Sequence, residues 1–177
     1  MTTGFPATPP VLSPVALIEA EIGTPQELGA LADGQRRIIP ILGGRVSGAR
    51  LAGRVLPGGA DWQTVRPDGL AEIEARYTLA LTEVDGAAVD ALVDIRNPGM
   101  RHGPAEVLAR VAAGEDVDPS LYYFRTTPRF TTGHPALGWM NRTLFVARGR
   151  RLAAQLTLET GRLGAAWARS RMFGPAG

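Results

Sequence analysis

Apolar and polar side chains alternate most clearly in two segments near the middle of the chain. In residues 73–81 (IEARYTLAL) and 89–97 (VDALVDIRN) the odd positions are mostly apolar and most of the even positions are polar or charged. A period of two is typical of a half-buried β-strand. Asp85-Gly86, between the two segments, predicts a β-hairpin, in a loop that we expect to exceed two residues. Residues 15–22 (VALIEAEI) alternate in the same way and predict another strand.

Glycine dominates the segment that precedes this hairpin. Residues 43–69 contain seven glycines and two prolines, with strand-forming residues between them. This pattern predicts strands bent at Gly48 and Gly53, with Asp61-Trp62-Gln63 on a tight turn. Upstream, residues 36–44 predict a short strand, and residues 23–34 a turn-rich connection with one helical turn.

The second half of the chain contains one helical pattern and three more strand patterns. Residues 104–113 predict a helix, because Pro104 suits a first helical turn and Gly114 suits the position after the last. Strands are predicted at 121–127, 139–148 and 152–160, the last two joined by a tight turn through Gly149.

Eight or nine short strands and a single helix predict an all-β fold, because a parallel sheet would need more helices. A single closed, antiparallel, streptavidin-like β-barrel is favoured, since no strand has the charges of a protected edge. We expect a loose N-terminal arm at residues 1–14, the barrel at 15–160 and an extension at 161–177 that includes a short amphipathic helix.

The strand alternation also predicts which polar side chains face the barrel interior. Tyr77 and Asn97 share the parity of their apolar neighbours, and the strand at 139–148 would bring Trp139, Asn141 and Thr143 inside. An apolar wall with a few polar groups is typical of a ligand pocket, and an eight-stranded barrel has room for one small ligand.

The strand at 121–127 leaves two alternatives open. Either Tyr123 and Arg125 point inward, or Tyr122 and Phe124 do.

Composition excludes several kinds of chemistry. The chain has no cysteine, two histidines and no lysine; all 19 basic residues are arginine. Disulfides, thiolate catalysis, histidine- or cysteine-rich metal sites and lysine Schiff bases are therefore excluded, and we expect neither a metal nor an organic cofactor.

Asp61, His102 and Arg125 are the candidate catalytic residues. Burial of Asp61 beside Trp62 would raise its pKa and make it a general acid or base; alternatively, Asp61 caps a turn. Arg125, flanked by aromatic residues, would bind an anion or a buried carboxylate. His102 precedes the predicted helix and would either transfer protons or be structural.

The candidate substrate-binding residues surround this set. Arg66 is one of them, as a substrate clamp, although a structural turn with an ion pair to Asp68 is the preferred interpretation. The remaining candidates are Trp62, Tyr77, Asn97, Tyr123, Trp139 and Asn141.

Charge and hydropathy limit the kinds of partner that we expect this protein to bind. Residues 1–141 have a net charge of −4 and residues 142–177 of +6, but no aromatic-interleaved basic motif indicates nucleic-acid binding. No apolar run is long enough to span a membrane and no signal peptide is apparent, so we expect a cytoplasmic protein.

Several motifs together resemble a known family. They are the glycine-rich segment at 43–69, then EARYTL, IRNPGMRHGP, DPSLYYFRTTPRF and WMNRTLFVARG. In this order they resemble the domain-of-unknown-function family numbered 3237, small and largely uncharacterised bacterial proteins, over residues 15–158. The resemblance implies a calycin-like barrel with one helix, often homo-oligomeric, that acts on small, often aromatic metabolites. The chain departs from the family after Leu158.

These observations lead to one functional hypothesis and two alternatives. The hypothesis is a cofactor-independent enzyme that performs acid–base chemistry (elimination, isomerisation or cyclisation) on a small aromatic or polyketide-like metabolite inside the barrel. The alternatives are a binding or carrier barrel without turnover and a structural homo-oligomer without a pocket. The C-terminal extension is expected to control access or assembly.

Overall fold

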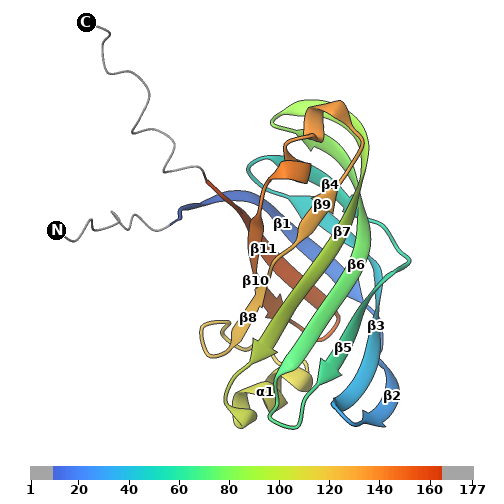
Figure 1. Cartoon of the computed structure of the whole chain (residues 1–177), viewed down its shortest axis with the longest axis vertical. Helices are drawn as coiled ribbons and strands as arrows, with labels where there is room; N and C mark the ends of the chain where they lie inside the picture. Colours follow the sequence, from blue (N-terminus) through green and yellow to red (C-terminus); the bar gives the residue numbers. More distant parts are fainter. Residues whose placement is uncertain (1–9, 165–177) are drawn as a thin grey trace, which may run out of the picture.

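The protein folds into one antiparallel β-sheet that closes on itself. Its structure is a computed structural model that describes residues 10–164. Eleven strands make up the sheet, and Figure 1 shows them wrapped around a common axis. They are β1 (Leu12–Ile22), β2 (Gln26–Leu31), β3 (Gly34–Ser47), β4 (Leu51–Val55), β5 (Gly59–Val65), β6 (Ala71–Val84), β7 (Ala87–His102), β8 (Tyr123–Thr126), β9 (Arg129–Thr131), β10 (Phe145–Arg151) and β11 (Gln155–Leu163). The predicted all-β barrel is confirmed.

The ring closes through the long hairpin of β6 and β7. The strands follow the order β6-β5-β3-β1-β11-β10-β8-β7, and β7 then pairs with β6; β2, β4 and β9 attach to this ring. Asp85 and Gly86 form the hairpin turn with φ of 51° and 81°, and Val84 pairs directly with Ala87. The loop therefore has two residues and is shorter than predicted, because both residues adopt the positive φ of a type I′ turn.

Inward-facing aliphatic side chains fill much of the barrel. Alternation buries every second residue from Ala71 to Leu81 in β6 and from Ala91 to Asn97 in β7, as the sequence predicts. Removal of this apolar surface from water is the main source of the stability of the fold. The largest fully buried side chains are Phe145, Ile18, Ile39, Leu51, Leu79, Leu81, Ile95, Leu137, Met140 and Leu158.

The predicted helix is confirmed and lies at one end of the barrel. Helix α1 (Ala105–Ala112) follows Pro104 and buries Val111, and Gly114 just beyond it has φ of 83°. Leu108 approaches the β5–β6 turn at Gly69, and Gly114 approaches Ala153 between β10 and β11. Helix α1 therefore covers the end of the barrel at which β7 finishes (Figure 1).

Several predicted boundaries are wrong. Residues 26–31 form strand β2 instead of a turn-rich connection, because a bulge between Glu27 and Gly29 lets the chain pair with β3. Gly149 lies inside β10 and not in a turn, since the β10–β11 connection comes later, at residues 152–154. β1 begins at Leu12 and β11 ends at Leu163, whereas the strands were predicted at 15–22 and 152–160.

The strand predicted at 139–148 begins only at Phe145. Two short 3-10 helices, η1 (Pro135–Leu137) and η2 (Met140–Arg142), come before it. The hydroxyl of Thr143 donates a hydrogen bond to the carbonyl of Trp139 at 2.8 Å and so stabilises the tight turn. The Asn141 side chain pairs with the backbone of Thr132, accepting from its N–H and donating to its carbonyl. These local hydrogen bonds take the place of the backbone hydrogen bonds to neighbouring strands that a β-strand would have formed.

Candidate functional site

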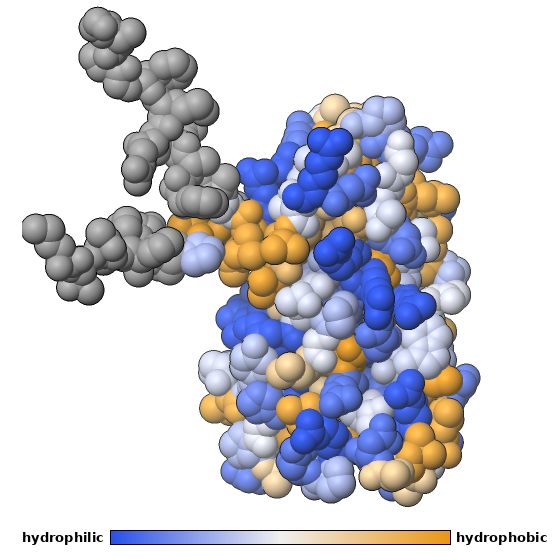
Figure 2. Space-filling model, viewed as in Figure 1, coloured by the Kyte–Doolittle hydropathy of each residue, from blue (hydrophilic) through white to orange (hydrophobic). Residues whose placement is uncertain are grey.

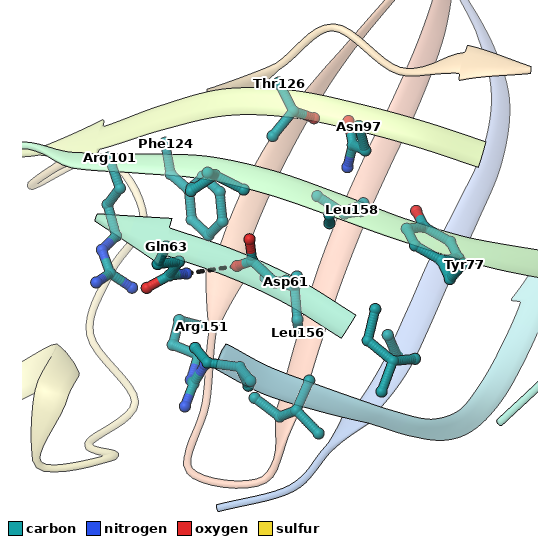
Figure 3. A pocket seen from close by; sticks show the side chains of 16 residues that line it. Asp61, Gln63, Tyr77, Asn97, Arg101, Phe124, Thr126, Arg151, Leu156 and Leu158 are labelled. Atoms are coloured by element: carbon teal, nitrogen blue, oxygen red, sulfur yellow. Dashed lines mark hydrogen bonds between the residues drawn. The ribbon is translucent and has the colours of Figure 1, made fainter. Parts of the chain in front are cut away.

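Asp61 lies inside the barrel on β5 and not on a turn. Gly58, with φ of 101°, makes the turn before this strand, so residues 59–65 are extended and Asp61 and Gln63 share the inward face. Asp61 is 6% exposed and Gln63 is 2% exposed. A buried carboxylate among aliphatic side chains is the central feature of this interior (Figure 3).

A short hydrogen-bond chain holds the Asp61 carboxylate. Gln63 Nε2 donates to Asp61 Oδ2 at 2.5 Å, and the backbone N–H of Glu74 donates to Asp61 Oδ1 at 3.1 Å. Gln63 Oε1 accepts from Arg37 Nε and Nη2 at 3.1 and 2.9 Å. Because Arg37 can only donate, the Gln63 amide can only present its nitrogen to Asp61. Gln63 is therefore a positioning residue for the carboxylate.

Burial raises the pKa of Asp61 above its ordinary value. The hydrogen bonds from Gln63 and from the Glu74 backbone, and the charges of Arg101 and Arg37, oppose this rise without cancelling it. A carboxyl group with a raised pKa exchanges its proton closer to neutral pH, which suits a general acid or base.

Polar side chains from the neighbouring strands face the same space. Asp61 pairs with Ala75 on β6, and Ala75 pairs with Asn97 on β7. Asp61 and Asn97 therefore lie in one cross-strand row, about 10 Å apart at the backbone, with the small side chain of Ala75 between them. The predicted inward orientation of Tyr77 and Asn97 is confirmed, at 5% and 1% exposure.

Three of these buried polar groups lack a hydrogen-bond partner among residues 10–164. They are the Tyr77 hydroxyl, Asn97 Oδ1 and the Thr126 hydroxyl. Burial raises the pKa of Tyr77, and the neighbouring Asn97 side chain opposes this rise without cancelling it, so the phenol stays protonated and can donate a hydrogen bond. Unpaired buried polar groups cost about 1–3 kcal/mol each, and they favour a polar guest in the cavity that they line.

The cavity itself is narrow. Its volume is about 20 Å³, which is room for one or two waters. Apolar side chains form most of its wall: Ala20, Ile22, Ile39, Ile41, Ile73, Ala75, Phe124, Leu156 and Leu158. Any larger guest requires the side chains at the cavity end to move.

Two arginines form that end of the cavity, next to α1. Arg101 is the last inward-facing position of β7, and Arg151 is the last residue of β10. In Figure 3 both lie on the Gln63 side of Asp61, while Tyr77 lies on the opposite side. Burial and the charges of Arg37 and Arg151 lower the pKa of Arg101 to about 10.

Arg125 lies on the outer wall of the barrel. The structure resolves the two alternatives for the β8 strand: Tyr122, Phe124 and Thr126 point inward, so Tyr123 and Arg125 point outward. Arg125 lines an outer groove of about 750 Å³ together with Trp62 and Tyr123. The sequence-based assignment of these three residues to the interior site therefore does not fit the strand parity.

His102 and Arg66 are also outside the cavity. His102 is exposed and its ring stacks on Tyr123 with 4.9 Å between the ring centroids. Arg66 forms the predicted ion pair with Asp68, at 3.2 Å, and a second with Glu72, at 3.6 Å.

Trp139 and Asn141 do not line the cavity either, because the strand that would have aimed them inward is absent. Trp139 is half-buried beneath Arg50, whose guanidinium carbon lies 4.0 Å from the centre of the indole ring, and Asn141 is exposed on η2. Asn141 supports the chain at Thr132 instead.

Within residues 10–164 no three His, Asp or Glu side chains are placed to hold a metal ion. In the same stretch no helix combines the length and apolar composition needed to cross a membrane.

Comparison with known proteins places the chain in a family. The sequence profile described as "Protein of unknown function (DUF3237)" matches residues 10–163. The chain belongs to this family. A UPF0311 protein of Rhodopseudomonas palustris is 46% identical over 145 residues, covering 82% of this chain and 91% of that protein.

Solved structures give the same result for the fold. A beta-barrel-like protein from Acinetobacter baumannii is 40% identical, with a TM-score of 0.75 over 91% of this chain and all of the other. An enzyme from Penicillium herquei is 17% identical, with a TM-score of 0.64 over 91% of this chain and 99% of that one. The latter likeness concerns the fold alone.

Sequence reasoning missed four interior residues of this DUF3237 protein: Arg37, Gln63, Arg101 and Arg151. The three arginines continue the inward parity of a strand beyond its apolar part, whereas Gln63 lies within β5, in a segment predicted as a turn. In β7, for example, the odd positions 93, 95 and 97 lead on to Arg101, but the predicted strand ends at Asn97. For the arginines the alternation contained the signal, and the predicted strand lengths were too short to show it.

Proposed function

We propose that this protein is a cofactor-independent enzyme that performs acid–base chemistry on a small aromatic or polyketide-like molecule inside the barrel. The observation that carries the proposal is Asp61, a buried carboxylate with a raised pKa, held by Gln63 and facing a cavity with unpaired polar groups. Perturbed carboxyl groups in concave sites are characteristic of catalytic acids and bases.

The proposed chemistry uses Asp61 and Tyr77. The Asp61 carboxylate removes a proton from a carbon next to a carbonyl, and the C–H electron pair moves into the enolate. The Tyr77 hydroxyl, which its raised pKa keeps protonated, donates a hydrogen bond to the enolate oxygen. Return of the proton to a different carbon is an isomerisation, and loss of a leaving group from the enolate is an elimination. In a cyclisation, the enolate carbon instead attacks a second carbonyl of the same molecule.

This assignment replaces Arg125 as the group that stabilises the oxyanion. Arg125 lies on the outer wall, where it cannot reach a guest beside Asp61. A likeness of fold to a protein described as an enzyme is compatible with catalysis on this barrel, although folds host many functions.

Hydrogen–deuterium exchange tests the proposal without knowledge of the natural substrate. In D₂O, wild-type protein is expected to exchange the α-hydrogens of at least one member of a panel of aryl ketones and cyclic 1,3-diketones, followed by proton NMR. Asp61→Asn should slow this exchange about 10²–10⁴-fold while ligand binding is kept. An unchanged rate would remove Asp61 from the mechanism.

The narrow cavity favours a second candidate, a structural barrel with a packed interior. About 20 Å³ admits water but no metabolite until side chains move. If no aromatic compound of the panel binds in saturation-transfer NMR, the structural candidate replaces the enzymatic one. Binding without exchange would instead support a carrier barrel.

A further inference from the structure

Arg101 is a half-buried cation that forms no ion pair within residues 10–164, although the charge of Asp61 acts on it. No hydrogen bond or ion pair joins its guanidinium to another residue in the described range 10–164, and the guanidinium carbon lies 5.9 Å from the centre of the Phe124 ring. Removing a guanidinium from water is unfavourable unless an anion or hydrogen-bond acceptors replace the water. The position of Arg101 therefore favours an anion at this end of the cavity.

Arg151 faces the same space from β10, which β8 separates from β7. Its Nε donates to the carbonyl of Leu152 at 2.9 Å, and this bond leaves its two terminal nitrogens for other acceptors. Burial and the charge of Arg37 lower the pKa of Arg151. Two guanidinium groups that repel each other across one cavity end gain most from a shared counter-ion.

Charge balance at this end favours a guest with a single negative charge. Arg37 is engaged by Gln63 and lies 3.9 Å from the exposed Glu27. Asp61 is the remaining carboxylate among the cavity-lining residues, and it must serve both Arg101 and Arg151. One further monoanion brings the summed charge of Arg101, Arg151 and Asp61 close to zero. A dianion would add a much larger desolvation penalty in so narrow a site.

The rest of the cavity is suited to an apolar body. Phe124, Leu156 and Leu158 line the space beyond the two arginines, and a flat ring packs well against such side chains. A guest held at the arginine end would extend from there towards Asp61 and Tyr77 (Figure 3).

We propose that Arg101 and Arg151 form an anion subsite that binds the carboxylate of an aromatic carboxylic acid, with the ring against Phe124 and the aliphatic wall. The planar guanidinium fork matches the two oxygens of a carboxylate. The inference rests on the proposed function, because it names the substrate class of the same cavity. The long arginine side chains swing outward to admit the ring and return to its carboxylate.

Benzoate and its neutral analogue benzamide test the subsite by calorimetric titration. Wild-type protein is expected to bind benzoate at least about tenfold more tightly than benzamide. Arg101→Met and Arg151→Met should each remove this preference and leave benzamide binding unchanged. Arg129→Met, on the exposed face of β9, is the matched control and should bind like the wild type. Circular dichroism verifies that each variant is folded.

Three results would overturn the subsite: equal affinity for benzoate and benzamide, a preference that survives both arginine substitutions, and tighter binding of inorganic phosphate than of benzoate. Asp61→Asn separates the subsite from the proposed catalysis, because it should retain benzoate binding. Benzoate binding that depends on Arg101, in a protein without Asp61-dependent exchange, would support the subsite and contradict the enzyme.

Discussion

At the residue scale, Asp61 couples the stability of the barrel to pH. Burial raises its pKa in the folded protein above the value of 3.8 expected for an unfolded chain. The folded state therefore binds the proton more tightly, and the stability associated with that proton is complete below about pH 4. It is lost as the pH rises through the raised pKa of Asp61, because the native state must then hold a buried charge.

Asp61→Asn should abolish the fall in stability that accompanies ionisation of Asp61. We expect the unfolding temperatures of the variant and the wild type to converge below about pH 4 and the variant to be the more stable at neutral pH. Scanning calorimetry over a pH series measures the difference. Asp90→Asn, which removes an exposed carboxylate from the outer face of β7, is the control for the loss of one charge. A variant that is less stable at neutral pH would mean that Asp61 stabilises the fold as an ion.

Gln63→Leu should shift the same titration upward. The substitution removes the Nε2 donor to Asp61 and leaves Arg37 without its acceptor. Loss of a hydrogen bond to the charged form raises a carboxyl pKa, so the fall in stability with pH should occur at higher pH than in the wild type. Gln35→Leu, at the exposed start of β3, is the matched control. An unchanged pH profile would show that Gln63 does not position the carboxylate.

At the element scale, alternation predicts a strand well where one face is regularly apolar and the other regularly polar. β6, β7 and α1 were predicted within a few residues, because their apolar periods are regular. Prediction failed where local hydrogen bonds outweigh the period, as at Asn141 and Thr143. The site was predicted in part for the same reason: Tyr77 and Asn97 follow from parity, whereas Asp61 was expected on a turn and Arg101 follows only if β7 continues through Pro98.

Packing between β8 and β10 gives a test of the barrel interior. A side chain at Gly149 would place its Cβ 2.6–2.7 Å from atoms of the Phe124 ring, so the two strands approach closely only because residue 149 is glycine. We expect Gly149→Ala to destabilise the protein by about 1–3 kcal/mol in urea unfolding. Gly133→Ala, where no atom lies within 4 Å of the added Cβ, should be nearly neutral. Equal effects of the two would contradict the packing.

At the scale of the whole molecule, the two ends of the barrel differ. One end holds α1 with Arg101 and Arg151, and the other holds η2 with Trp139. Apolar side chains gather on the surface where the described chain begins and ends (Figure 2). Val11, Leu12 and Leu144 are each about half exposed, at 54%, 49% and 59%. Such a patch is typical of a contact surface.

The extension predicted from residue 161 lies mostly outside the described residues, and β11 occupies its first three positions. Truncation after Gly164 should keep the thermal transition, because the Gly164 N–H donates to the Val11 carbonyl and every β11 pair remains. It should lower the mass measured by light scattering or alter benzoate affinity. Truncation after Thr160, which removes the Leu12–Leu163 pair, should lower the unfolding temperature. If mass and affinity both stay unchanged, the extension is passive.

The central claim is that Asp61 is a buried carboxyl group poised to exchange a proton with a guest in the barrel. Carbon-13 NMR of the side-chain carboxyl groups, with the Asp61 signal assigned by its loss in Asp61→Asn, measures this directly. The account predicts a titration midpoint above the ordinary aspartate value, because burial outweighs the hydrogen bonds from Gln63 and Glu74. It also predicts a further rise when benzoate is added, since a second negative charge disfavours ionisation. A midpoint at or below the ordinary value, unmoved by benzoate, would contradict the account.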